Sequence, residues 1–390
     1  MTLSVLFNTA SGLAGSDEYE LGLRDLRNAL GRNSNLHQWH EFDASSPSCA
    51  PGQLLPTVQG EQVLAILNPA VIVSDSFLET LAQVLTNYPQ SCVLPADPRD
   101  AVGPWQIDYA SRLGFERYVQ RRQGLPPSRP GTGLAPWLFM ANTQALQSAL
   151  AQSPALGWSD LPGAMPEPAY IAERAFVHSY ADYQKNDRRE FLHLIPPDVK
   201  KLMDVGGGEG GFLRAFQQQR NAQVLLVEPN TASSDVARSN GVAVFNGRFE
   251  ALDPDQAGLF DCISFLDVLE HFEHPLAALQ HAHRLLRPGG HVALSIPNVG
   301  HWSVVQGLLH GRFDYLPVGI LCCTHLRFFT ERSLRGLLED ANFKVETWHA
   351  QHQPLPDEFA RELGVRPNTA TSWDLQSLGT DSFHVIALRR

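Results

Sequence analysis

Residues 202–210 constrain the fold of this chain more than any other segment, because they join an apolar run to a cluster of glycines. They read Leu-Met-Asp-Val-Gly-Gly-Gly-Glu-Gly, and a second apolar run, Val-Leu-Leu-Val, ends at Glu228. Glycines let a backbone approach a ligand closely, and a carboxylate at a strand tip accepts hydrogen bonds from both hydroxyls of a ribose. The two segments predict a strand, a glycine turn that opens a helix, and a second strand, which together form a nucleotide-type cofactor site.

The glycine spacing alone leaves two kinds of cofactor open. Gly206, Gly208 and Gly211 also satisfy the pattern G-x-G-x-x-G of dinucleotide-binding turns, which is a weak signal by itself. Asp204 precedes the first glycine closely, and an anion there is unfavourable beside the phosphates of a dinucleotide. S-adenosylmethionine (SAM) has no phosphate and carries an ammonium and a sulfonium group. Asp204 and Glu209 therefore favour SAM over a nicotinamide dinucleotide.

Length and composition indicate two domains and exclude some partners. The 390 residues exceed the usual size of one domain, and a net charge of −11 argues against a basic, phosphate-binding face. The five cysteines form no C-x-x-C pair, which suggests a reducing compartment. The N-terminus lacks signal-peptide features, and no apolar run reaches the ~20 residues of a membrane span. We expect a cytoplasmic protein that binds no nucleic acid and has no membrane span; its oligomeric state stays open.

Segments rich in proline, glycine and serine predict the domain boundaries. We place a linker at 151–169, between an α/β accessory domain over 1–150 and a larger domain over 170–390. In the larger domain, β-rich runs alternate with helical stretches, which predicts a doubly wound, mostly parallel sheet. Its expected strands are 201–205, 223–227, 242–245, 260–266, 291–296, 343–349 and 383–388, and its helices include 211–220, 275–286 and 331–341. In the accessory domain we expect strands at 3–7, 63–66 and 93–95, and helices near 18–30, 76–88 and 106–122.

Residues 170–390 resemble the class I SAM-dependent methyltransferases, in particular a branch associated with glycan synthesis. The resemblance rests on Asp204–Gly210, Glu228, the segment 260–275, Leu285–Gly290 and the stretch 311–330. It implies a Rossmann-like, seven-stranded sheet with an antiparallel last strand, and SAM bound over the carboxyl ends of the strands. The chain departs from the family pattern at Glu209, which replaces a small hydroxyl residue, and at Cys322, near which the branch has an acid.

The resemblance also gives candidate ligands for SAM. They are Asp204, Gly206, Gly208, Gly210, Glu228, Phe249, Asp267 and Tyr183. Structural alternatives are a tight turn for the glycines, loop bracing for Asp204 and core packing for Phe249. Tyr180, Tyr183 and Arg188 match a lid over the cofactor, where aromatic rings face a sulfonium favourably, but an amphipathic packing helix explains them as well.

The candidate catalytic residues are Asp267, His271 and His325. Methyl transfer needs a nucleophile in line with the sulfonium, and a general base helps when that nucleophile is a hydroxyl. The two histidines have a suitable pKa range, although loop anchoring explains them equally well. No metal site is expected from the histidines after the fourth strand, which fit no compact zinc spacing: His271, His274, His281 and His283.

Residues 63–122 loosely resemble part of a family 2 glycosyltransferase, in which a strand ends in an acidic pair that holds the metal of a nucleotide-sugar. The corresponding place here reads Asn68-Pro-Ala-Val, and Asp75 lies too far along to replace the acid. The resemblance implies a domain that has lost sugar transfer and serves binding or assembly. An unrelated α/β accessory domain is the alternative.

Together these features predict a SAM-dependent methyltransferase that acts on an oxygen of a sugar or glycan in polysaccharide or glycoconjugate biosynthesis. One alternative is a small aromatic or quinone-like acceptor, for which the aromatic stretch Phe313–Phe329 would line an apolar pocket. The other is a SAM-binding scaffold for glycan enzymes, consistent with Ala70 and Cys322 in place of expected acids. The methylated atom and any metal dependence stay open.

Overall fold

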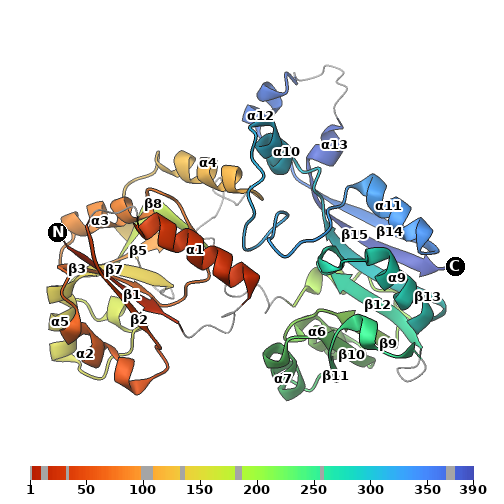
Figure 1. Ribbon diagram of the computed structural model, residues 1–390, viewed down its shortest axis with the longest axis horizontal. Coiled ribbons are helices and arrows are strands. Elements are labelled where there is room, and N and C mark those ends of the chain that lie inside the picture. Colours follow the sequence, from red (N-terminus) through yellow and green to blue (C-terminus); the bar gives the residue numbers. More distant parts are fainter. Residues whose placement is uncertain are drawn as a thin grey trace. The chain divides into compact units, whose positions relative to one another are not determined.

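The computed structural model divides the chain into two compact units, each built around its own sheet (Figure 1). It describes residues 2–9, 16–31, 35–97, 109–131, 137–180, 187–254, 259–365 and 374–390. The first unit comprises residues 1–181 with Tyr315–Val318, and the second comprises 182–314 with 319–390. The boundary thus falls later than the linker expected at 151–169. Trp158, Leu161 and Met165 pack into a core of the first unit, so this proline-rich segment is part of that unit.

The first unit has a mixed, eight-stranded sheet in the order β2-β1-β3-β7-β5-β8-β4, with β6 paired to β8. β1 runs parallel to β2 and β3, whereas β7 is antiparallel to β3 and β5, and β8 is parallel to β5. The strands are β1 (Leu3–Asn8), β2 (Leu36–Phe42), β3 (Gln62–Ile66), β4 (Val71–Val73), β5 (Cys92–Ala96), β6 (Arg129–Pro130), β7 (Leu138–Asn142) and β8 (Tyr170–Ser179). The helices are α1 (Asp17–Gly31), α2 (Pro51–Leu54), α3 (Phe77–Asn87), α4 (Arg112–Arg122) and α5 (Thr143–Gln152). The α/β fold expected for this part of the chain is confirmed.

The second unit has a seven-stranded sheet in the order β11-β10-β9-β12-β13-β15-β14. Its strands are β9 (Lys201–Val205), β10 (Gln223–Glu228), β11 (Val244–Asn246), β12 (Phe260–Leu266), β13 (Leu286–Pro297), β14 (Phe343–His352) and β15 (Thr380–Arg389). β15 is antiparallel to both of its neighbours, and the pairs from β11 to β13 are parallel. The Rossmann-like sheet with an antiparallel last strand is therefore confirmed.

Helices cover both faces of this sheet because successive strand residues point to opposite sides. Leu202 packs in one core with α6 (Gly211–Gln219) and α7 (Thr231–Ser239), and Met203 packs in the other with α9 (Pro275–Leu285) and α11 (Glu331–Asp340). A smaller cluster joins α10 (Trp302–Leu309), α12 (Asp357–Glu362) and α13 (Leu375–Leu378). The carboxyl ends of the parallel strands share one edge, where open α/β sheets bind ligands. In the described parts of the chain, no helix has both the length and the apolar character that crossing a membrane requires.

The packing of α11 gives a test of this core. Leu338 is fully buried against the sheet, so Leu338→Ala is expected to lower the free energy of unfolding of the second unit by about 2–5 kcal/mol. Leu309→Ala is the matched control, because the Leu309 side chain is 59% exposed and should change stability by less than about 0.5 kcal/mol. Urea unfolding followed by circular dichroism measures both; equal losses would contradict the packing described here.

Candidate functional site

The turn between β9 and α6 can be formed only with glycines at its key positions. Gly206, Gly208 and Gly210 have φ values of +70°, +55° and +75°, in the left-handed region that disfavours side chains. A Cβ atom on Gly206 would also lie 2.9 Å from the Val268 side chain. The backbone of this turn thus faces the end of the neighbouring strand β12 without intervening side chains.

The carboxylate of Glu228 clamps the glycine turn from the end of β10. Its Oε2 accepts a hydrogen bond from the Gly208 amide at 3.0 Å, and its Oε1 accepts one from the Asn230 amide at 2.8 Å. Burial raises the pKa of Glu228, and these two amide donors oppose that rise because they favour the charged form. A carboxylate offers about four acceptor positions, so the two amides leave capacity for a ligand's hydroxyls.

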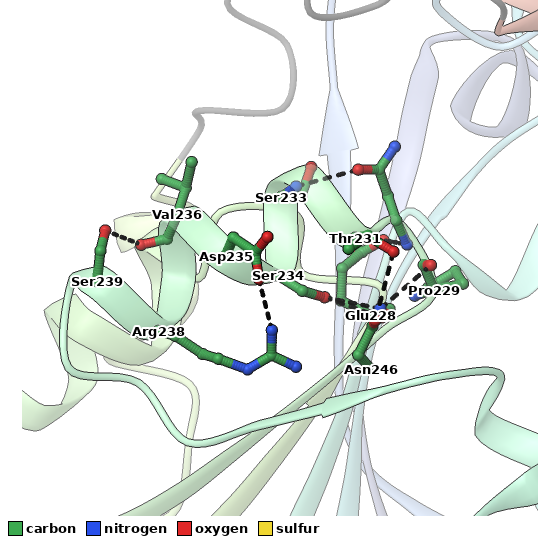
Figure 2. A network of polar contacts seen from close by, with 11 residues as sticks. Glu228, Pro229, Thr231, Ser233, Ser234, Asp235, Val236, Arg238, Ser239 and Asn246 are labelled. Atoms are coloured by element: carbon green, nitrogen blue, oxygen red, sulfur yellow. Dashed lines mark hydrogen bonds and ion pairs between the residues drawn. The ribbon is translucent and has the colours of Figure 1, made fainter.

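A polar network fixes the backbone of Glu228 (Figure 2). The side-chain amide of Asn246 donates to the Glu228 carbonyl at 2.9 Å and to the Pro229 carbonyl at 3.2 Å. The Ser234 hydroxyl, in the first turns of α7, donates to the same Glu228 carbonyl at 3.1 Å. The end of β10 is thereby tied to both α7 and β11, which fixes the origin of the Glu228 side chain.

Asp204 lies beneath the turn and is buried. Its Oδ1 accepts a 2.6 Å hydrogen bond from the hydroxyl of Ser264, its register partner on β12. Burial raises the pKa of Asp204 to about 7, against the opposing effect of Ser264. A Cβ atom on Gly207 would lie only 2.1 Å from Asp204 Oδ2, so the carboxylate supports the turn directly. This position agrees with the loop-bracing interpretation of Asp204.

Asp267 adopts an unusual backbone conformation at the end of β12. Its φ is +56°, a left-handed value that a residue other than glycine adopts rarely and most often at functional sites. Arg188 forms an ion pair of 2.6 Å with Asp267 Oδ2 and donates to the Ser295 hydroxyl, which itself donates to Asp267 Oδ1. The segment before β9 is thereby joined to the ends of β12 and β13.

A cavity of about 520 Å³ opens beside these groups, within the size range of small-molecule sites. Three of the expected site residues line it: Gly206, Phe249 and His271. Phe249 also packs edge-to-face on Phe265 at 5.3 Å, so it belongs to the core as well as to the cavity wall. Much of the remaining wall is apolar and comes from Val205, Val227, Val268, Phe272, Ala277, Ala278 and Leu326. Such a site suits an adenosyl group or a flat apolar acceptor.

The histidines expected to act in catalysis lie side by side although they are far apart in the sequence. The His271 and His325 rings are 4.7 Å apart between centroids and nearly perpendicular. The segment that carries His325 is attached to the turn after β12, because the Leu326 and Arg327 amides both donate to the Glu270 carbonyl. His325 therefore lies beside His271, although it is not among the residues that line the cavity.

Other expected groups lie elsewhere. Tyr183 lies outside the described residues, and Tyr180 packs in the first unit. Of the histidines that were not expected to bind a metal, His281 lines the same cavity, with its Nδ1 2.9 Å from Arg284, and His283 contacts the Arg390 carbonyl. Sequence reasoning missed Ser264, Ser295 and Asn246, which hold the site acids in place. Only the register between neighbouring strands links Ser264 to Asp204, and sequence spacing does not reveal that register.

Comparisons with known proteins match part of the chain to methyltransferases. A family model described as "Methyltransferase domain" matches residues 177–347. The "Ubiquinone biosynthesis O-methyltransferase" of Pseudomonas aeruginosa (strain LESB58) is 37% identical over 132 residues, 30% of this chain and 56% of that protein. A protein of the same description from Acinetobacter baylyi is 35% identical over 190 residues, 46% of this chain and 76% of its own. The chain thus spans about half the length of the first of these relatives.

Among solved structures, a SAM-dependent methyltransferase from Archaeoglobus fulgidus aligns with a TM-score of 0.39 and 13% identity. The alignment covers 53% of this chain and 94% of that one.

The buried state of Asp204 predicts an effect of pH on stability. The Asp204 pKa is about 7 in the fold against an ordinary value of 3.8, so between these values the folded chain binds a proton that the unfolded chain has released. The contribution of Asp204 to stability is therefore favourable near pH 4 and is lost as the pH rises through 7. Asp204→Asn should accordingly gain stability relative to wild type as the pH rises from 4 to 7, and level off above. Thermal unfolding of the ligand-free protein across this range measures the difference in stability between variant and wild type. Asp340→Asn, at an exposed position of α11, is the control. A difference for Asp204→Asn that does not change with pH would contradict the assignment.

Proposed function

Because the chain belongs to the family of SAM-dependent methyltransferases, we propose that it methylates a hydroxyl oxygen of a small aromatic, quinol-like acceptor. The observation that carries the proposal is the apolar cavity of about 520 Å³ beside the clamped glycine turn, with His271 in its wall. The names of the relatives, ubiquinone biosynthesis O-methyltransferases, support an aromatic acceptor over the sugar expected from the sequence.

The donor set fits SAM. Glu228 would accept the ribose hydroxyls, the backbone from Gly206 to Gly210 would lie against the cofactor, and Phe249 would contact the purine. Asp204 would support the turn from below, while Asp267 and Tyr183 remain proposed contacts to the methionine end. When bound, SAM supplies an electrophilic methyl group on a positively charged sulfur.

The chain's own groups would act on the acceptor. The apolar wall around Val268, Phe272 and Leu326 would exclude water from a flat ring. His271 is one of three histidines in the cavity wall, with His274 and His281, and it is the one that lies beside His325. It would stand where an acceptor hydroxyl loses its proton. Arg188 would hold the negatively charged side chain of Asp267 in place after β12, beside the cofactor.

A sugar or glycan acceptor is the second candidate. Its support is the first unit, in which Asn8 ends β1 while Asn68 and Asp97 follow β3 and β5, all at one edge of the sheet. The Asn68 side chain caps its own turn by accepting from the Ala70 amide at 3.0 Å.

Free thiols at all five cysteines support the cytoplasmic location that the sequence predicts.

The cofactor assignment predicts a loss of SAM affinity in Glu228→Gln. This change keeps the shape of the side chain but removes the charge that would bind both ribose hydroxyls, which should weaken binding by about 10- to 100-fold. Titration calorimetry measures the affinity, and Glu339→Gln on the exposed face of α11 serves as the control. Unchanged binding in Glu228→Gln would remove the basis of the cofactor site.

The acceptor class is tested with SAM that carries a labelled methyl group. Substituted phenols and quinols are offered beside nucleotide-sugars and lipid-linked glycans, and we expect label in an ether of the aromatic fraction. Label in the glycan fraction alone would overturn the proposal in favour of the second candidate. SAM binding without transfer to either fraction would indicate a non-catalytic scaffold.

A further inference from the structure

Three side chains with metal-binding atoms converge at the rim of the cavity. Glu270 and His271 lie in a short 3₁₀ turn, Leu269–His271, after β12, and His325 lies in the segment that packs on this turn. One ligand atom of each side chain lies within 4.8 Å of those of the other two. His325 Nε2 is 3.8 Å from Glu270 Oε1, which is too long for a hydrogen bond.

The hydrogen bonds of the two imidazoles orient them for this role. His271 Nδ1 lies 3.1 Å from the Thr324 carbonyl, and His325 Nδ1 lies 2.9 Å from the Ile320 carbonyl. A carbonyl oxygen can only accept, so each Nδ1 carries the proton and the lone pair of each neutral ring is on Nε2. Backbone carbonyls fix metal-binding histidines in the same way, by determining the tautomer and the ring orientation.

The buried carboxylate of Glu270 is an independent indication that the cluster binds a ligand. Its side chain is fully buried, and neither carboxylate oxygen has a hydrogen-bond partner within the described part of the chain. A buried carboxylate without donors is costly whether charged or neutral, and native structures normally pair such groups or use them to bind an ion.

The backbone around the cluster is fixed on both sides. The Glu270 carbonyl accepts from the Leu326 and Arg327 amides, and the Arg327 guanidinium donates to the Glu273 carbonyl at 2.6 Å. These bonds hold the two segments together independently of the three side chains. These backbone contacts, and not contacts among the three side chains, therefore place the carboxylate beside the imidazoles.

We propose that Glu270, His271 and His325 bind a divalent transition-metal ion, for which zinc is the best match. Two imidazoles and one carboxylate form a ligand set of catalytic zinc sites, in which a further position stays open for water or substrate. This set differs from the four histidines after the fourth strand considered in the sequence, of which only His271 takes part.

The site deepens the proposed function and rests on it for its role. His271 is the ligand that lines the cavity, and the open metal position would face an acceptor hydroxyl bound there. An ion held by these three side chains would lower the pKa of that hydroxyl, whose proton would pass to solvent. The oxygen lone pair would then form the new C–O bond while the C–S electron pair stayed on sulfur, giving a methyl ether and a neutral thioether.

The test uses the full-length chain, stripped of metal with a chelator and then titrated with Co²⁺ and Zn²⁺. We expect one equivalent per chain, a visible Co²⁺ absorption that Zn²⁺ displaces, and a rise in melting temperature with Zn²⁺. Glu270→Gln and His325→Gln should each weaken zinc binding by about 100-fold or more. His274→Gln is the matched control, because His274 lines the same cavity outside the cluster and should bind zinc like wild type.

Several outcomes separate this site from its alternatives. Zinc affinity that is unchanged in Glu270→Gln, or equally reduced in His274→Gln, would overturn the site. If Glu270→Gln does not fold, the Co²⁺ spectrum of His325→Gln decides in the same way. Stoichiometric zinc binding without methyl transfer to any aromatic acceptor would support the site and overturn the proposed function. Full methyl transfer by a metal-free protein that binds no zinc would overturn the site and leave the proposed function standing.

Discussion

The left-handed turn between β9 and α6, held by the carboxylate of Glu228, is the constraint on which the rest of the site depends. Three glycines with positive φ allow the chain to leave β9 and enter α6 within a few residues. Glu228 holds this turn through the Gly208 amide, and Asp204 supports it from below through Ser264. The Asp204–Ser264 pair therefore links β9 to β12, and Glu228 links the end of β10 to the turn, which holds one wall of the cavity in place.

The second wall depends on a contact distant in sequence. The segment around His325 packs on the turn after β12 through three hydrogen bonds. Two run from backbone amides to the Glu270 carbonyl, and one runs from His271 to the Thr324 carbonyl. This contact closes the cavity with Leu326 and brings two imidazoles and a buried carboxylate together. The same backbone contact thus explains both the apolar acceptor space and the cluster to which we assign a metal.

Most of the second unit could be predicted from the sequence, because its strands are apolar runs that begin and end at glycine, proline or charged residues. Residues 287–290, which the sequence leaves between an expected helix and an expected strand, form the start of β13, with an irregularity opposite Phe260. In the first unit, β8 escaped prediction because its centre carries Glu173, whose charge is paired with the buried Arg122 at 2.7 Å. Motifs likewise located Gly206, Phe249 and His271, whereas the pairs Asp204–Ser264, Arg188–Asp267 and Glu270–His325 arise from register and tertiary packing that no spacing records.

The central claim is that the clamped turn and the cavity beside it form one cofactor site. A crystal structure with S-adenosylhomocysteine tests it most directly. We predict the ribose hydroxyls within hydrogen-bond distance of the Glu228 carboxylate and the purine against Phe249, with the turn unchanged. A ligand bound away from Glu228, or a turn that must open to admit it, would contradict the account.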